Sequence, residues 1–78
     1  MNAWALWTLA GHRYAAYTAD GFAIEVWPHL KGGYSWRIVD AHTDYKVEDA
    51  PEGFDTTIEN AMRHSEGAFR DWLAMDAA

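Results

Sequence analysis

The sequence predicts an α+β fold of two layers, in which an antiparallel meander of three or four strands carries a C-terminal helix on one face. Two segments of alternating apolar and polar residues, 22–27 and 34–39, are typical of half-buried strands. A later segment, from residue 58 to about residue 74, repeats its apolar residues at helical spacing. The chain has 78 residues, enough for one small core, so we expect a single domain over residues 1–78.

Turn signals separate the first three predicted strands. Residues 13–18 favour a strand, and the Asp20-Gly21 pair that follows is a strong signal for a hairpin turn. Pro28 ends the second strand, because proline cannot donate a hydrogen bond to a neighbouring strand. The Lys31-Gly32-Gly33 segment then provides the return to the third strand.

Two further segments give weaker signals. Residues 44–48 predict a fourth strand, and the turn-forming residues at 49–53 predict a loop before the helix. Residues 4–9 fit a strand and a helix equally well, since alanine and leucine favour a helix while the tryptophans favour a strand. The first segment of the chain therefore stays open between the two.

The helix has a start signal and an apolar stripe. Thr56 and Glu59 predict a capping box, in which the Thr56 hydroxyl accepts from the Glu59 amide and the Glu59 carboxylate reaches back. Glu66 and Arg70, four residues apart, predict an ion pair on the outer face. The stripe that faces the sheet comprises Ile58, Met62, Ser65, Phe69, Trp72 and Leu73.

These patterns also predict which side chains form the core. Its members are Phe22, Ile24, Val26, Trp36, Ile38, Ile58, Met62, Phe69, Trp72 and Leu73. Five tryptophans and four tyrosines exceed what a two-layer core of this size can hide. We therefore expect partial exposure among the remaining ones, which are Trp4, Trp7, Tyr14, Tyr17, Trp27, Tyr34 and Tyr45. Exposed aromatic side chains serve as anchors in protein interfaces, but they also simply cover an open sheet face.

Composition excludes several classes of function. The chain has no cysteine, which excludes disulfides, thiolate zinc sites and a cysteine nucleophile. Its apolar runs are far shorter than the ~20 residues that span a bilayer, and a basic signal-peptide start is lacking, so we expect a cytoplasmic protein. The sequence contains no phosphate-binding glycine loop and no nucleophile elbow. We therefore expect no enzymatic activity and no cofactor.

The net charge of −6 is concentrated in one stretch of the chain. Residues 40–59 carry seven acids and one base, Lys46, which gives 1 − 7 = −6. The rest of the chain has five bases and five acids and is neutral. Such a segment repels nucleic acid and acidic membranes and attracts a basic partner, although it also serves simply as a soluble face.

We predict that this acidic segment and the aromatic side chains near it bind a basic protein. The predicted partner-binding residues are Trp27, Asp40, Asp44, Tyr45, Glu48, Asp49, Glu52 and Asp55. Charges of this kind steer the encounter, while buried aromatics slow dissociation. We expect no direct contact with nucleic acid or membranes, and a monomer or weak dimer.

One constellation suggests a different class of function. If residues 40–44 are extended, Asp40, His42 and Asp44 share one face and could bind a divalent metal or act in acid–base catalysis. A metal-dependent or acid–base enzyme is therefore an alternative. Residues two apart at a polar strand end produce the same pattern without any site, and we favour that interpretation.

Two resemblances bear on function. Gly53-Phe54-Asp55-Thr56, Glu59-Asn60-Ala61 and Asp71-Trp72-Leu73 resemble the corresponding part of HicB-type antitoxins, in which a glycine, a threonine cap and a Glu-Asn-Ala helix follow three strands. This resemblance covers about a third of the chain and implies an antitoxin or regulatory subunit with a cognate toxin.

The whole-chain profile resembles small phage-encoded anti-CRISPR proteins, which are short, acidic, cysteine-free α+β proteins without catalytic motifs. This resemblance implies a non-enzymatic inhibitor that blocks target-DNA binding by occupying a basic surface of a CRISPR effector subunit in the host cytoplasm. It supplies no residue roles. The inhibitor is our leading hypothesis, and the HicB-like antitoxin is the alternative.

Overall fold

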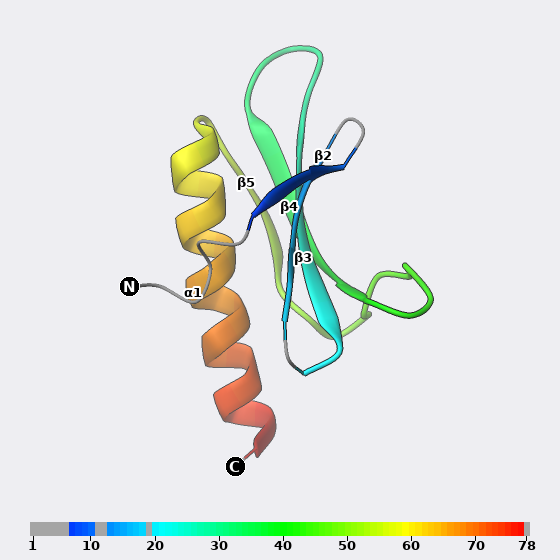
Figure 1. Cartoon of the computed structure of the whole chain (residues 1–78). Helices are drawn as coiled ribbons and strands as arrows, with labels where there is room; N and C mark the ends of the chain where they lie inside the picture. The colour runs from blue at the N-terminus through cyan, green and yellow to red at the C-terminus, as the bar shows by residue number, and fades with distance from the viewer. Residues whose placement is uncertain (1–6, 11–12, 19, 78) are drawn as a thin grey trace.

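The computed structural model describes residues 7–10, 13–18 and 20–77 and confirms the α+β fold (Figure 1). Its elements are β1 (Thr8–Ala10), β2 (Arg13–Tyr17), β3 (Phe22–Pro28), β4 (Tyr34–Asp40), β5 (Glu52–Asp55) and α1 (Ile58–Ala77). The strands pair antiparallel in the order β1-β2-β3-β4-β5, so neighbours in the sheet are also neighbours along the chain. Of the ambiguous segment 4–9, residues 4–6 lie outside the described part, while β1 begins at Thr8.

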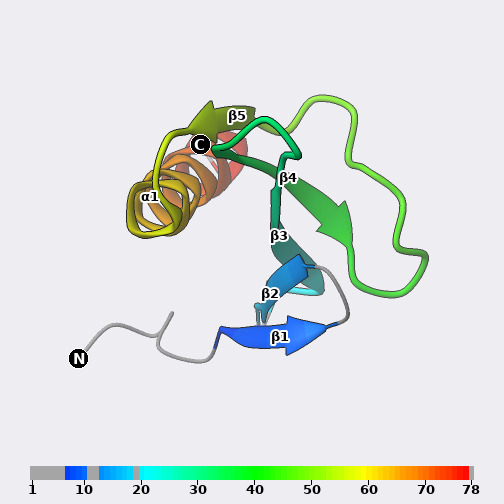
Figure 2. The ribbon, with the colours of Figure 1, turned by 90° about the horizontal axis from the view of Figure 1, so that it is seen from above.

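The helix and the sheet form two layers. Seen from above, the sheet curves from β1 to β5 and α1 lies on the inner side of this curve (Figure 2). The helix packs against β3, β4 and β5. The register places Ile24 opposite Ile38 and Val26 opposite Trp36, so the apolar residues of the two central strands form one surface beneath the helix.

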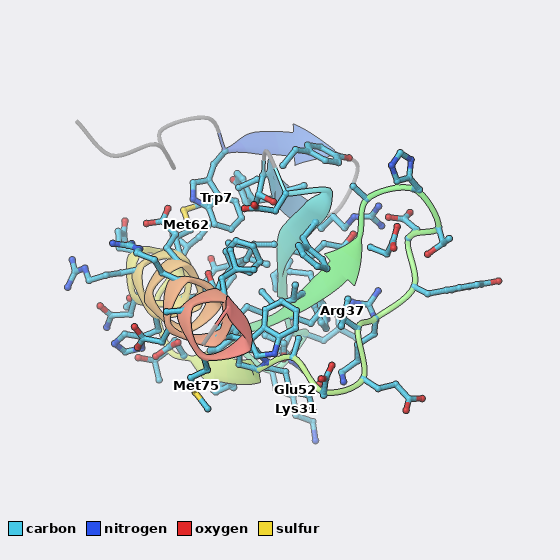
Figure 3. All side chains as sticks on the ribbon, turned by 90° about the horizontal axis from the view of Figure 1, so that it is seen from below. Trp7, Lys31, Arg37, Glu52, Met62 and Met75 are labelled. Carbon is cyan, nitrogen blue, oxygen red and sulfur yellow. The ribbon has the colours of Figure 1, made fainter. Side chains whose placement is uncertain are left out.

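The core lies between this surface and the apolar stripe of α1. All ten predicted core residues are either buried or packed against a buried cluster, as expected. Edge-on ring contacts tie the layers together: the centroid of Phe22 lies 5.8 Å from that of Phe69 and 5.3 Å from that of Trp72. Trp7 packs against both clusters, and Figure 3 shows it beside Met62 of the helix.

The predicted turns occur where glycine provides the required backbone conformation. Gly21 has φ 88°, and the Thr18 amide donates to the Phe22 carbonyl at 2.9 Å across this turn. Gly32 and Gly33, with φ 99° and 82°, form the return between β3 and β4. These dihedral angles lie in the region that L side chains rarely adopt, which explains why the glycine pairs predict the turns.

The predicted fourth strand at residues 44–48 is wrong, and the predicted loop at 49–53 contains part of a strand. The Asp40 carboxylate accepts from the amides of His42 and Thr43 at 2.8 and 3.2 Å, which turns the chain directly after β4. Asp44 follows with φ 67°. Only a single bridge, between Val39 and Lys46, remains from the expected pairing, and the ladder resumes at β5.

Two predictions for α1 are also corrected. Thr57, not Thr56, caps the helix: its hydroxyl accepts from the Asn60 amide at 3.2 Å. Glu66 does not lie on the outer face, because its side chain is buried and accepts from the Trp7 indole Nε1 at 2.7 Å. Within the described ranges, no helix is long and apolar enough to cross a membrane.

Candidate functional site

A buried carboxylate lies at the centre of the sheet face that points away from α1. Glu25 is only 2% exposed, although it stands in the middle of β3. Glu25 is directly opposite Arg37 of β4, and its Oε1 lies 3.1 Å from Nε of that arginine. Its Oε2 lies 2.8 Å from Nε of Arg13 on β2, but the N–H of that group is not directed at the oxygen, so this contact is an ion pair rather than a hydrogen bond.

The neighbouring charges extend this arrangement into a row of alternating sign. Arg13 also contacts Asp44, with Nη2 and Oδ2 3.4 Å apart, and Lys46 Nζ lies 3.5 Å from Glu52 Oε1. The Arg37 guanidinium lies over the ring of Trp27, 5.2 Å from its centroid. Arg13, Arg37 and Lys46 therefore each have an acidic partner within the described part of the chain.

The metal or acid–base constellation predicted at Asp40, His42 and Asp44 is not assembled. Asp40 binds the amides of its own turn and Asp44 is directed to Arg13, so the three side chains do not share one extended face. No group of three or more histidine or acidic side chains that could hold a metal ion is found among the residues that the structure describes.

The segment between β4 and β5 carries exposed negative charge, and Figure 2 shows it extending beyond the sheet on the side away from the helix. Glu48 and Asp49 are exposed, and in the described part of the chain neither makes an ion pair. Tyr45, on the same segment, is 77% exposed. These three residues, which we call the acidic loop, present charge and an aromatic ring together.

The predicted partner-binding residues therefore divide into separate groups. Asp40 and Asp44 lie near the acidic loop, at the end of β4, but both carboxylates have partners there. Trp27 lies opposite Ser35, at the other end of β4, whereas Glu52 on β5 lies opposite Arg37 in the middle of β4 and contacts Lys46. Because Ser35 and Asp40 are five residues apart in one strand, the position of Trp27 lies roughly 17 Å from the end of β4, and Glu52 lies between the two.

Asp55 belongs to neither group. Its Oδ1 lies 2.7 Å from Nδ1 of His64 on α1, and its Oδ2 accepts from the Trp36 indole at 3.2 Å. The side chain is only 15% exposed. Asp55 thus connects β5 to the helix and to β4, and its predicted contact with a partner stays a prediction.

Trp27 and Glu52 line a shallow hollow that the sequence does not reveal. Its volume is about 420 Å³, and its walls are completed by Ser35, Trp36, Gly53 and Phe54. The predicted loop ends at Gly53 and no strand is predicted around Phe54, so the position of Phe54 on β5 and its 54% exposure were not predicted. The burial of Glu25 was missed as well, since only the register of β2 and β4 brings the two arginines to it.

Comparisons of the chain with protein-family models, with curated proteins and with solved structures find no match. The arrangement of charges and aromatic side chains is therefore the basis for the functional argument.

Proposed function

We propose that this chain is a small non-enzymatic protein that binds a basic surface of a nucleic-acid-binding complex and inhibits it, as an anti-CRISPR protein inhibits a CRISPR effector. The observation that carries the proposal is the acidic loop. Glu48 and Asp49 are exposed without ion pairs among the described residues, beside the exposed ring of Tyr45. Exposed acids steer a basic partner, and an aromatic side chain holds it after contact.

The positions of the bases also support a basic protein as the partner. On the open sheet face, Arg13, Arg37 and Lys46 each contact a carboxylate, so these bases are compensated within the protein. A nucleic-acid-binding surface requires bases that are free to neutralise phosphates. The excess charge that reaches the solvent is negative, which favours a basic protein as the partner.

The HicB-like antitoxin remains the second candidate because of one local feature. Gly53 lies in β5, and Glu59, Asn60 and Ala61 form the first turn of α1, so the resembling residues occupy one continuous passage from strand to helix. The cap is Thr57, one residue later than in the resemblance. This candidate predicts a dimer and a toxin that co-purifies with the chain.

The test measures inhibition of target-DNA binding by purified CRISPR effector complexes, with fluorescence anisotropy of labelled DNA as the readout. We expect the chain to inhibit at least one effector type, and we expect the inhibition to weaken steeply with salt, because screening acts over ~8–10 Å. The double variant Glu48→Lys/Asp49→Lys should abolish inhibition by lowering the association rate. Tyr45→Ala should act mainly on dissociation.

The matched control is Glu59→Lys/Asp71→Lys, which changes the net charge equally at two exposed positions of α1. This control should retain inhibition. Equal loss in both double variants would mean that total charge, not the acidic loop, determines binding. Full inhibition by Glu48→Lys/Asp49→Lys, or binding that is independent of salt, would refute the electrostatic mechanism. A toxin that co-purifies with the chain would support the antitoxin in place of the inhibitor.

A further inference from the structure

The hollow beside β5 is lined by aromatic side chains and one carboxylate. Trp27 and Phe54 supply rings on the sheet face away from α1 and Glu52 supplies the carboxylate, while Trp36, a core side chain that is only 7% exposed, also lines the hollow. Arg37 and Glu52, labelled in Figure 3, lie on the sheet face away from α1. The hollow and the acidic loop consist of different residues, and the contact between Glu52 and Lys46 lies between them.

Two glycines permit this arrangement of rings. A Cβ atom on Gly53 would lie 2.6 Å from the Trp36 ring, and one on Gly33 would lie 2.1 Å from the Phe54 ring. Such distances are too short for any other residue, so both rings pack directly against backbone. Phe54 is also held edge-on by His29, with ring centroids 5.4 Å apart. The walls are therefore fixed in position although Phe54 is largely exposed.

The chemistry of the walls favours a planar cation. Trp27 already accepts a guanidinium, that of Arg37, 5.2 Å from its ring centroid. The Glu52 side chain is 62% exposed, and its contact with Lys46 is a long 3.5 Å surface pair, which contributes little and is readily replaced. An incoming guanidinium could thus stack on aromatic rings and donate to a carboxylate in one place, a combination that arginine provides and lysine does not.

We propose that this hollow binds an arginine side chain of the protein partner. The inference rests on the proposed function, in that the partner is basic, but it concerns a second contact region. Arginine anchored in the hollow would fix the orientation of the partner, while the acidic loop accelerates its approach. The two regions together would give a bipartite interface about one strand length across.

The experiment titrates the ¹⁵N-labelled chain with the peptide acetyl-Gly-Arg-Gly-amide at millimolar concentration. The indole N–H signals of Trp27 and Trp36 report on the hollow, and those of Trp7 and Trp72 serve as internal references in the core. We expect the first pair to shift and saturate while the second pair does not move. The peptide with citrulline in place of arginine has the same shape without the charge and should cause no shift.

Two variants test the walls individually. Phe54→Leu keeps an apolar side chain but removes the ring, and Glu52→Gln keeps the shape but removes the charge. Each should raise the dissociation constant of the arginine peptide by about 2- to 5-fold. Tyr17→Leu makes the same type of change at a 61% exposed ring on β2, outside both the hollow and the acidic loop, and should leave the constant unchanged. A thermal melt of each variant verifies that it is folded.

Several results would overturn the inference. These are the absence of shifts at Trp27 and Trp36, equal shifts with the citrulline peptide, and tighter binding of tetramethylammonium, which would indicate a quaternary ammonium ligand instead. Unchanged affinity in folded Phe54→Leu and Glu52→Gln would also overturn it. The variant Glu48→Gln/Asp49→Asn should retain peptide binding, so failure of the hollow and failure of the proposed inhibition are observed separately.

Discussion

Replacing Glu25 by glutamine tests whether the buried carboxylate holds the open sheet face together. The substitution keeps the volume and removes the charge, so no cavity contributes to its effect. In the native protein the carboxylate compensates Nε of Arg13 at 2.8 Å and Nε of Arg37 at 3.1 Å. In the variant the two guanidinium groups remain on adjacent sides of an uncharged amide.

The magnitude follows from these distances and from exposure. With an effective dielectric constant of about 20, each contact contributes roughly 5–6 kcal/mol before the desolvation of the carboxylate is subtracted. Loss of one partner from a fully buried ion pair costs about 3–5 kcal/mol. The Arg13 and Arg37 side chains are 38% and 37% exposed, so water offsets part of the loss. We therefore expect Glu25→Gln to lower the free energy of unfolding by about 2–4 kcal/mol.

Urea unfolding followed by circular dichroism measures this change. A domain of this size has a total stability of about 4–12 kcal/mol, so the expected loss is a large part of it. In a thermal melt the same loss should lower the melting temperature by roughly 10–25 °C. The control is Asp44→Asn, which removes an exposed 3.4 Å contact of the same Arg13 and should cost less than about 1 kcal/mol. If Glu25→Gln changes stability by no more than the control, the interpretation of Glu25 as the centre of the face is refuted.

Four further substitutions test the fold. Trp72→Ala should cost about 3–5 kcal/mol and leave the chain largely unfolded, and a cooperative melt near that of the native protein would mean that the apolar stripe faces solvent. Thr57→Ala should lower the free energy of unfolding by about 1 kcal/mol because it removes the N-cap, whereas Thr56→Ala should lower it much less. If the urea midpoint falls more in Thr56→Ala than in Thr57→Ala, Thr56 is the cap, as the sequence predicted. Gly33→Ala combines φ 82° with a Cβ position 2.1 Å from the Phe54 ring, so we expect a loss of at least about 1–3 kcal/mol, and a neutral effect would contradict the close packing of that ring.

The sequence was informative wherever one local cause determines the structure. Gly21, Gly32 and Gly33 predicted turns because their dihedral angles are unfavourable for other residues. The core face of β3 and β4 followed from alternation alone, since a period of two assigns every second side chain to the helix layer. The stripe of α1 followed in the same way from a period of 3.6.

The predictions failed where a side chain competes with the backbone for hydrogen bonds, or where the register of the strands decides which side chains are buried. Asp40 binds the amides of its own turn, which removes residues 44–48 from regular pairing with β4. Gly53 was interpreted as part of a turn, but it lies in an edge strand, where glycine is tolerated and provides space for Trp36. Glu25 looked like the polar half of an alternating strand, and only the pairing of three strands shows that it is buried.

The predicted partner-binding residues divide into separate groups for the same reason, since the sequence does not show which side chains contact one another. The acidic segment was recognised because net charge is a property of the sequence, but its individual partners are not. Structure assigns Asp44 to Arg13, Glu52 to Lys46 and Asp55 to His64, which leaves Glu48 and Asp49 as the exposed acids of the loop between β4 and β5. A count of charges therefore overestimates the number of carboxylates that are available to a partner.

The sequential order of the strands has a consequence for how the chain folds. Each strand pairs with its neighbour along the chain, so every hairpin closes only a short loop, and the sheet can begin to form early and fast. Isolated hairpins are only marginally stable, however, and the apolar face of β3 and β4 packs against α1, the last element, as well as against Trp7 and Val47. During synthesis the part of this face that packs against α1 stays open to water until the helix has left the ribosome. Cooperative folding should therefore await release of residues 58–77, and nascent chains arrested before that point should expose an aggregation-prone sheet.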